Sequence, residues 1–264
     1  MKDILLVGGA GGIGRAVALY LAQKGCRVFS ADIADTHAQH ENIVPVRIDI
    51  RSMDSVQQAH AIVKEMCEGL DAVISLAGVY IMDSLVEVSE SEIARIMDIN
   101  VLGVYRVNKV FVPLMRKGGR FIITTSELEG LRPFPFNGMY SMSKTALGCY
   151  ADSLRLEVQL LGLKAIAIRP GAFDTQMVES TDAQMQQMVH TTALYKMGTK
   201  NFARIMHSQT GSARDPKLLA KVYYKAVMRK NPRLTYTKHA SVMIKAYAMM
   251  PRRLQAFVIR AILK

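Results

Sequence analysis

The sequence has few cysteines and no long apolar run. Its three cysteines, Cys26, Cys67 and Cys149, lie far apart in segments that we predict as helices or strands. This favours reduced thiols in a cytoplasmic protein over a disulfide framework. No stretch of 18 apolar residues occurs, which excludes a transmembrane helix. Apolar residues 4–7 give way at once to glycines, so we do not interpret the N-terminus as a signal peptide.

Internal repeats, low-complexity tracts and Pro/Ser/Gly-rich linkers are also absent. Half of the residues are hydrophobic and 21% are charged, which predicts a packed core throughout. With 264 residues, we expect a single α/β domain over residues 1–264. No metal site is predicted.

Acidic residues are nearly missing from the C-terminal fifth of the chain. Residues 213–264 contain 13 Lys and Arg but only one acid, Asp215, so this segment holds the whole net charge of +12. Residues 238–264 read as a basic extension that ends in an amphipathic helix. Its apolar stripe consists of Leu254, Phe257, Val258, Ala261 and Ile262, whereas Arg253, Arg260 and Lys264 lie elsewhere.

Two interpretations of this extension remain open. A basic amphipathic helix can lie on an anionic membrane, which would make the protein peripheral to it. Alternatively, the stripe packs on the body of the protein or on a partner subunit. We expect no nucleic-acid binding, because no recognisable module accompanies the charge.

Short apolar runs alternate with longer amphipathic stretches through the rest of the chain. This alternation predicts a doubly wound parallel sheet covered by helices. We expect a helix over 140–161, a Met-rich helical lid over about 172–211 and an edge strand at 234–236. The predicted buried strands are residues 4–7, 27–31, 44–48, 72–76, 121–124 and 165–168.

A glycine-rich turn follows the first strand and leads into a helix. Two fingerprints match it: one has its glycines at Gly9, Gly11 and Gly14, the other at Gly8, Gly12 and Gly14. Glycines let the backbone approach a pyrophosphate, and the helix N-terminus supplies free N–H groups. We therefore predict a dinucleotide site here, although the turn alone does not choose between the fingerprints.

Asp32 ends the second strand, eighteen residues after Gly14. A carboxylate at this point can accept hydrogen bonds from the adenosine ribose. It would repel the extra phosphate of NADP by roughly 4 kcal/mol at 4 Å and an effective dielectric near 20. No Lys or Arg adjoins it in sequence, so we predict NAD as the cofactor. The alternative is an ordinary exposed acid at a strand end.

Tyr140 and Lys144 are four residues apart, on one face of the predicted helix. The preceding strand ends next to Ser126. Because ligands bind at the carboxyl ends of parallel strands, Ser126, Tyr140 and Lys144 can converge on the cofactor.

At this point the sequence resembles the short-chain dehydrogenase/reductase family over about its first 180 residues. The matching positions are Gly8, Gly12, Gly14, Asp32, Asp49, Ile50, Ala77, Gly78, Asn100, Ser126, Tyr140, Lys144 and 170–175. The resemblance implies a Rossmann domain that transfers a hydride between nicotinamide and an alcohol or ketone. It also implies a homodimer or homotetramer built through the helices that hold Asn100 and Tyr140.

The resemblance assigns a role to each candidate catalytic residue. Tyr140 exchanges the proton, Ser126 hydrogen-bonds the substrate oxygen, Lys144 holds the nicotinamide ribose, and Asn100 completes a proton relay through water. The implied cofactor-binding residues are Gly8, Gly11, Gly12, Ile13, Gly14, Asp32, Asp49, Ile50, Ala77, Gly78, Tyr140, Lys144, Pro170, Gly171 and Thr175.

Some positions depart from the family pattern. Ser75 and Leu76 stand where two asparagines are usual, and Val7 replaces the threonine before the first glycine. The separation between Ser126 and Tyr140 is one or two residues longer than is usual in the family. Thr125 is therefore the alternative if the family's serine position aligns one residue earlier.

The lid and the loop before Tyr140 hold methionines and aromatic residues, including Phe134, Phe136, Phe173, Tyr195 and Phe202. Such side chains suit a bulky apolar substrate, and the chain weakly resembles family members that act on steroids and retinoids. Packing or subunit contact is the alternative. For the whole chain, the competing function is a non-catalytic dinucleotide sensor or scaffold; a sugar-nucleotide epimerase is disfavoured by the short chain.

Overall fold

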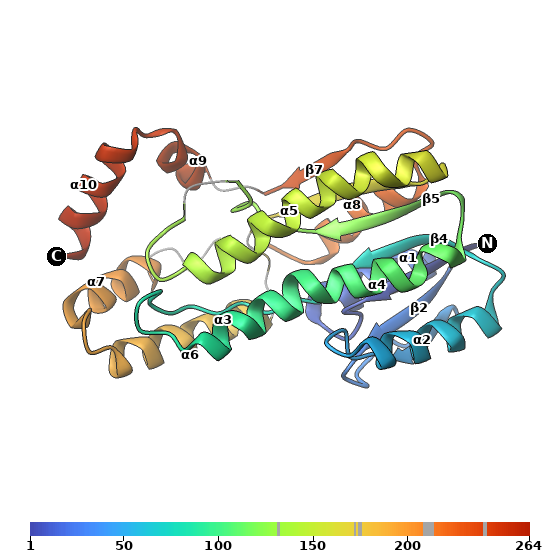
Figure 1. Cartoon of the computed structure of the whole chain (residues 1–264), viewed down its shortest axis with the longest axis horizontal. Helices are drawn as coiled ribbons and strands as arrows, with labels where there is room; N and C mark the ends of the chain where they lie inside the picture. Colours follow the sequence, from blue (N-terminus) through green and yellow to red (C-terminus); the bar gives the residue numbers. More distant parts are fainter. Residues whose placement is uncertain (131–132, 172, 174–175, 208–213, 240–241) are drawn as a thin grey trace.

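The computed structural model describes residues 1–130, 133–171, 173, 176–207, 214–239 and 242–264. Within these residues seven strands form one sheet in the order β3-β2-β1-β4-β5-β6-β7, and all neighbouring pairs are parallel. The strands are β1 (Lys2–Val7), β2 (Cys26–Asp32), β3 (Ile43–Arg47), β4 (Leu70–Ser75), β5 (Met115–Thr124), β6 (Lys164–Pro170) and β7 (Thr235–Lys238). This confirms the predicted doubly wound parallel fold (Figure 1).

Helices cover both faces of the sheet. The helices of the body are α1 (Gly12–Gln23), α2 (Met53–Met66), α3 (Glu90–Met97), α4 (Gly103–Phe111), α5 (Gly138–Val158) and α8 (Lys217–Met228). Successive side chains of β1 alternate between the faces: Ile4 and Leu6 pack with α1 and α8, and Leu5 and Val7 pack with α2 and α4. Both sides of the central strands are therefore buried, which is why these strands read as continuous apolar runs.

Four more helices lie at the end of the molecule toward which the strands point (Figure 1). They are α6 (Gln176–Thr191), α7 (Lys196–His207), α9 (Val242–Met249) and α10 (Arg252–Leu263). The segment predicted as a lid, about 172–211, thus contributes α6 and α7. Their side chains Met185, Met188 and Phe202 form a separate apolar cluster with Met82, which follows β4.

The C-terminal extension folds back onto the lid. Asn201 of α7 donates a hydrogen bond to the carbonyl oxygen of Leu263, at 3.4 Å, so α10 is anchored on α7. No helix in the described ranges is long and apolar enough to cross a membrane.

Local predictions around the sheet are confirmed within a few residues. The helix expected over 140–161 is α5 followed by a 3₁₀ turn, Gln159–Leu161, and Gly162 ends it with φ of +71°. The expected edge strand at 234–236 is β7, which pairs with β6.

Candidate active site

A cavity of about 1280 Å³ lies at the carboxyl ends of the central strands. One side is lined by the glycine turn and the ends of β2 and β4, the other by α6, α7 and α10. Open parallel sheets bind their ligands at this edge. The lid and the extension therefore enclose the place where the fold puts a cofactor.

The glycine turn forms a cradle at the bottom of the cavity. Gly8 has φ of +90°, and a Cβ on it would overlap the backbone of Ala77. A Cβ on Gly14 would overlap the carbonyl group of Gly8. Both positions thus require glycine, and the first turn of α1 is left open toward the cavity, where Gly11 and Gly12 line it. This shape fits a dinucleotide pyrophosphate.

Asp32 lines the cavity at the end of β2. Its carboxylate accepts hydrogen bonds from the backbone N–H groups of Ala10 (2.9 Å) and Ala34 (3.1 Å). The nearby Arg51 also lines the cavity, but it forms an ion pair with Asp49 at 2.7 Å. Hydrogen bonding to Arg51 lowers the pKa of Asp49, so this carboxylate stays ionised.

Tyr140 and Ser126 both line the cavity. Burial raises the pKa of Tyr140 to about 12, an effect that hydrogen bonding with Ser126 reduces. Thr125, our fallback, instead donates from its hydroxyl to the carbonyl oxygen of Ile168 at 3.3 Å. The geometry therefore favours Ser126 as the residue beside Tyr140.

Lys144 lies one helical turn after Tyr140 and is 5% exposed. Its Nζ donates to the carbonyl oxygen of Thr124 at 3.2 Å and lies 5.7 Å from the ring centre of Tyr140. Burial lowers the pKa of Lys144 to about 8, and the carboxylate of Glu129 opposes this. The charge of Lys144 is therefore sensitive to mildly alkaline pH.

Asn100 is fully buried in a π-helical turn, Asp98–Leu102, between α3 and α4. Its side chain exchanges two hydrogen bonds with the backbone of Val79, at 2.8 and 2.9 Å, and donates a third to the Ser143 hydroxyl at 3.0 Å. Such π-turns are frequent at functional sites. Here the turn lets one amide tie the loop after β4 to α5, next to Tyr140 and Lys144.

These features agree with comparisons to known proteins. A family model described as short chain dehydrogenase matches residues 2–186. The chain belongs to the short-chain dehydrogenase family. It is thus an oxidoreductase of a family that binds a nicotinamide dinucleotide cofactor.

Several relatives in this family are similar to the chain. A 3-ketodihydrosphingosine reductase of Bacteroides thetaiotaomicron is 30% identical over 234 residues, covering 87% of this chain and 84% of that protein. Estradiol 17-beta-dehydrogenase 2 of Mus musculus is 29% identical over 192 residues, 69% of this chain but only 50% of that longer protein. An NADPH-dependent 1-acyldihydroxyacetone phosphate reductase of Schizosaccharomyces pombe is 29% identical over 183 residues, 67% of this chain and 61% of that protein.

The fold is also that of solved short-chain dehydrogenase structures. The aldohexose dehydrogenase of Thermoplasma acidophilum superposes with a TM-score of 0.77 at 20% identity, covering 95% of this chain and 97% of that one. At this identity, the likeness concerns the fold alone.

The structure brings nearly all the predicted short-chain dehydrogenase residues to one cavity. Asn100 lies behind its wall and shapes it, and Thr175 lies outside the described residues. The predicted residues that line the cavity are Gly8, Gly11, Gly12, Ile13, Gly14, Asp32, Asp49, Ile50, Ala77, Gly78, Ser126, Tyr140, Lys144, Pro170 and Gly171.

The departures from the family pattern are accommodated in different ways. Leu76 lines the cavity, while the buried hydroxyl of Ser75 has no hydrogen-bond partner among the described residues. The longer loop before Tyr140 is held by Glu129, which forms an ion pair with Arg169 at the end of β6. These differences leave the Tyr140 and Lys144 arrangement intact.

Sequence reasoning missed several residues of the cavity. Tyr80, two residues after Gly78, has its ring centre 4.8 Å from that of Tyr140, and burial raises the pKa of Tyr80. Gln184 of α6 accepts from the N–H of Met82 (2.9 Å) and donates to the carbonyl oxygen of Tyr80 (3.1 Å). An aromatic residue two positions after Ala77-Gly78 is the available sequence signal for Tyr80, whereas no sequence signal indicates Gln184.

Aromatic residues of the predicted apolar set divide between the cavity and packing. Phe134, stacked on Tyr247 at 4.4 Å, and Phe202 line the cavity. Phe136 instead lies against Tyr195 and Phe202, with ring centres 5.6 and 5.4 Å apart. Cavity lining therefore accounts for some of these residues and packing for others.

Proposed function

We propose that this short-chain dehydrogenase interconverts a secondary alcohol and its ketone with NAD, and that the substrate is bulky and lipophilic. The observation that carries the proposal is that Ser126, Tyr140 and Lys144 line the same cavity at the carboxyl ends of the strands. Nicotinamide would accept or deliver the hydride there, held over the strand ends by the glycine turn and Lys144. The residues of the chain supply the proton and the geometry.

Tyr140 serves as the acid in ketone reduction. Its pKa of about 12 keeps the phenol protonated at neutral pH, ready to donate to the substrate oxygen that Ser126 also hydrogen-bonds. In alcohol oxidation the phenol has to lose its proton, and burial works against this. The charges of Lys144 and of an oxidised nicotinamide then stabilise the phenolate.

The NAD preference is supported by the surroundings of Asp32. The additional phosphate on the adenosine ribose of NADP would meet this carboxylate, and Arg51, which also lines the cavity, is paired with Asp49. The Schizosaccharomyces pombe relative is named as NADPH-dependent, so the proposed preference rests on the residues of this chain and not on its family.

The apolar half of the cavity supports a lipophilic substrate. Methionine and aromatic side chains surround the approach to Tyr140, and the far wall is α10. The lining side chains there include Met82, Phe134, Met185, Phe202, Met206, Tyr247, Met250, Val258, Ile259, Ile262 and Leu263. Two relatives are named for sphingoid and steroid substrates. In this proposal the chain is one domain in which residues 172–211 act as the substrate lid. Residues 238–264 form a wall of the cavity and do not extend freely into solvent.

We further propose that the protein is a homodimer or homotetramer joined through α4 and α5. Both helices expose apolar side chains: Tyr105 of α4 is 41% exposed, and Met142 and Leu156 of α5 are 48% and 66% exposed. Burying this surface against another copy would remove it from water.

The test is a turnover assay with paired variants. Purified protein is mixed with NAD and steroid or long-chain secondary alcohols, or with NADH and the matching ketones, and the absorbance of reduced cofactor is followed. Tyr140→Phe should bind NAD normally by calorimetry yet lose about 10²–10⁴-fold in rate, because only the ionisable oxygen is removed. Rates above a tenth of the original in this variant would refute the mechanism. NAD binding without turnover of any substrate would point to the sensor function.

A further inference from the structure

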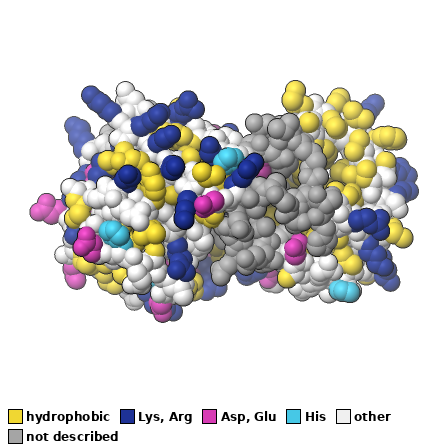
Figure 2. Space-filling model, turned by 180° about the vertical axis from the view of Figure 1, so that it is seen from behind, with side chains coloured by type: hydrophobic (Ala, Val, Ile, Leu, Met, Phe, Trp, Pro, Cys, Tyr) yellow, Lys and Arg dark blue, Asp and Glu magenta, His cyan; other side chains and the backbone are white. Residues whose placement is uncertain are grey.

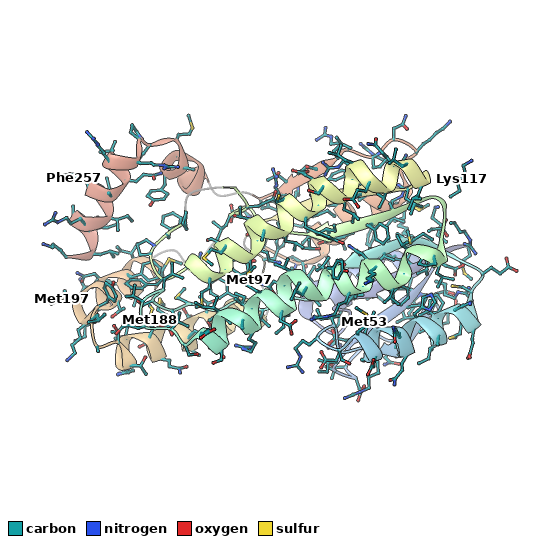
Figure 3. The ribbon with its side chains drawn as sticks, viewed as in Figure 1. Met53, Met97, Lys117, Met188, Met197 and Phe257 are labelled. Atoms are coloured by element: carbon teal, nitrogen blue, oxygen red, sulfur yellow. The ribbon has the colours of Figure 1, made fainter. Side chains whose placement is uncertain are left out.

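The end of the molecule formed by α7 and α10 exposes large apolar side chains. Phe257 of α10 is 69% exposed and Met197 of α7 is 61% exposed, with both side chains at the same end of the molecule (Figure 3). Leu194, just before α7, is 68% exposed and Leu254 is 46% exposed. Isolated exposed leucines are common, but a cluster on one face marks an interaction site.

The two faces of α10 have different surroundings. Gln255 is buried, and Val258 and Leu263 line the cavity. Phe257 points the other way. Arg253 lies four residues before Phe257 and Arg260 three residues after it, so these arginines flank it on the outward face. This corrects the expected single stripe, in which Val258 and Phe257 shared a face away from the arginines.

The outward face of α7 has the same character. Met197, Lys200 and Arg204 follow one another at helical spacing and are all exposed. Neither helix contains an aspartate or glutamate. Figure 2 shows the result at this end of the molecule, where apolar side chains are interspersed with Lys and Arg.

We propose that this surface docks on an anionic lipid bilayer. The α7–α10 face comprises Leu194, Met197, Lys200, Arg204, Arg253, Leu254, Phe257 and Arg260. Its apolar side chains enter the boundary of headgroups and acyl chains, and its cations meet the lipid phosphates. A second copy of the chain is a poorer partner, because two such faces would oppose like charges with no acid to offset them.

Docking has a consequence for the substrate, which rests on the proposed function. The helix that meets the bilayer on one side lines the apolar half of the cavity on the other, through Val258, Ile259 and Ile262. A lipophilic substrate dissolved in the membrane would thus lie within one helix diameter of the cavity. The face is therefore placed where a membrane-dissolved alcohol or ketone would leave the bilayer.

Co-sedimentation with vesicles tests the docking without any turnover. The full chain should bind phosphatidylcholine vesicles containing phosphatidylserine, and binding should weaken as salt reduces the Debye length from about 10 Å to about 3 Å. Phe257→Ser combined with Met197→Ser, and separately Arg253→Glu combined with Arg260→Glu, should each lower the partition coefficient by roughly tenfold or more.

Matched variants elsewhere provide the controls. Leu160→Ser removes an 85% exposed leucine beyond α5, and Lys221→Glu with Lys225→Glu makes the same charge change on α8. Both should bind vesicles like the original. Equal losses from both charge reversals would mean attraction by net charge alone, and no loss from either face variant would overturn the proposal. Face variants that change the molecular mass in solution but not vesicle binding would show that a second copy covers the face.

Discussion

Two residues at the proposed reaction centre have pKa values displaced by the same cause. Burial raises the pKa of Tyr140 to about 12 and lowers the pKa of Lys144 to about 8, because it disfavours the charged form of each. The Tyr140 phenol therefore stays protonated at neutral pH. The Lys144 ammonium group has the pKa nearer to neutrality. We therefore expect the pH dependence of turnover to depend on Lys144.

Ketone reduction should decline in mildly alkaline solution. The reaction needs a protonated Tyr140 and a charged Lys144, so kcat/KM should be level at low pH and fall as pH rises through about 8. Rates with NADH, measured from about pH 6 to about pH 10, give the profile. In Lys144→Arg, whose guanidinium stays charged, the residual activity should lose this decline. A level profile in the original protein would show that the charge of Lys144 is not needed.

Cofactor choice is also decided at the scale of one residue. NAD should bind at least about tenfold more tightly than NADP, and Asp32→Ala should narrow the gap by removing both the ribose hydrogen bonds and the repulsion. Calorimetric titration of both cofactors into both proteins measures this. Asp35→Ala is the control, because this aspartate is 85% exposed and pairs with Arg47. Equal affinities in the original protein would place Asp32 away from the ribose.

At the scale of elements, two carboxamides hold the loop between β4 and α3. Asn100 binds the backbone of Val79 from one side, and Gln184 of the lid binds the backbone of Tyr80 and Met82 from the other. Each amide pairs with an N–H and a carbonyl group, as a neighbouring strand would. The loop keeps the Tyr80 ring against Tyr140. A shift of the lid would therefore be passed through the loop to Tyr140, the proposed proton donor.

Gln184→Ala should therefore impair substrate use more than folding. Loss of two hydrogen bonds, each contributing about 1 kcal/mol, frees the loop and the lid, so KM should rise several-fold while NAD affinity is kept. Steady-state kinetics and thermal unfolding measure both effects. Gln187→Ala, on the exposed side of α6, should match the original, and Gln184→Glu should restore only the bond to Met82. An unchanged KM in Gln184→Ala would show that the two hydrogen bonds of Gln184 do not affect substrate binding.

The same elements show what the sequence could and could not predict. Strands such as Ile4 to Val7 can be predicted because a local apolar run and the glycine turn after it determine them. The Tyr140 and Lys144 pair can be predicted because its spacing is also local in the sequence. The hydrogen bond from Gln184 to Tyr80 joins residues 104 positions apart, and the one from Asn201 to Leu263 joins residues 62 positions apart. No local periodicity encodes such contacts, which is why the sequence alone left open whether α10 packs on the body of the protein or lies on a membrane.

At the scale of the whole molecule, ion pairs connect the strands at the edge of the sheet where the central strands begin. Asp3 of β1 pairs with Arg27 of β2 at 2.6 Å and with Arg116 of β5 at 3.2 Å. Asp71 of β4 pairs with Lys2 at 2.9 Å and with Arg116 at 3.0 Å. The network connects four strands at the edge opposite the cavity, so it contributes to stability and can vary without touching the site.

This network should make stability fall in acid. Burial tends to raise the pKa of Asp71, but hydrogen bonds from Lys2 and the Asp3 backbone outweigh it, and the pKa is lowered. A lowered folded-state pKa stabilises the protein above the unfolded value near 3.9, and this contribution is lost as pH falls through the folded value. Asp71→Asn should therefore lower the free energy of unfolding by roughly 1–3 kcal/mol at neutral pH. In urea titrations, the difference in free energy of unfolding between Asp71→Asn and the original protein should stay constant down to about pH 5 and shrink below about pH 4.

Asp35→Asn is the control, because Asp35 belongs to an exposed ion pair, and its free energy of unfolding should be almost that of the original protein. If the difference for Asp71→Asn did not shrink in acid, the variant would have lost packing and not a charge interaction.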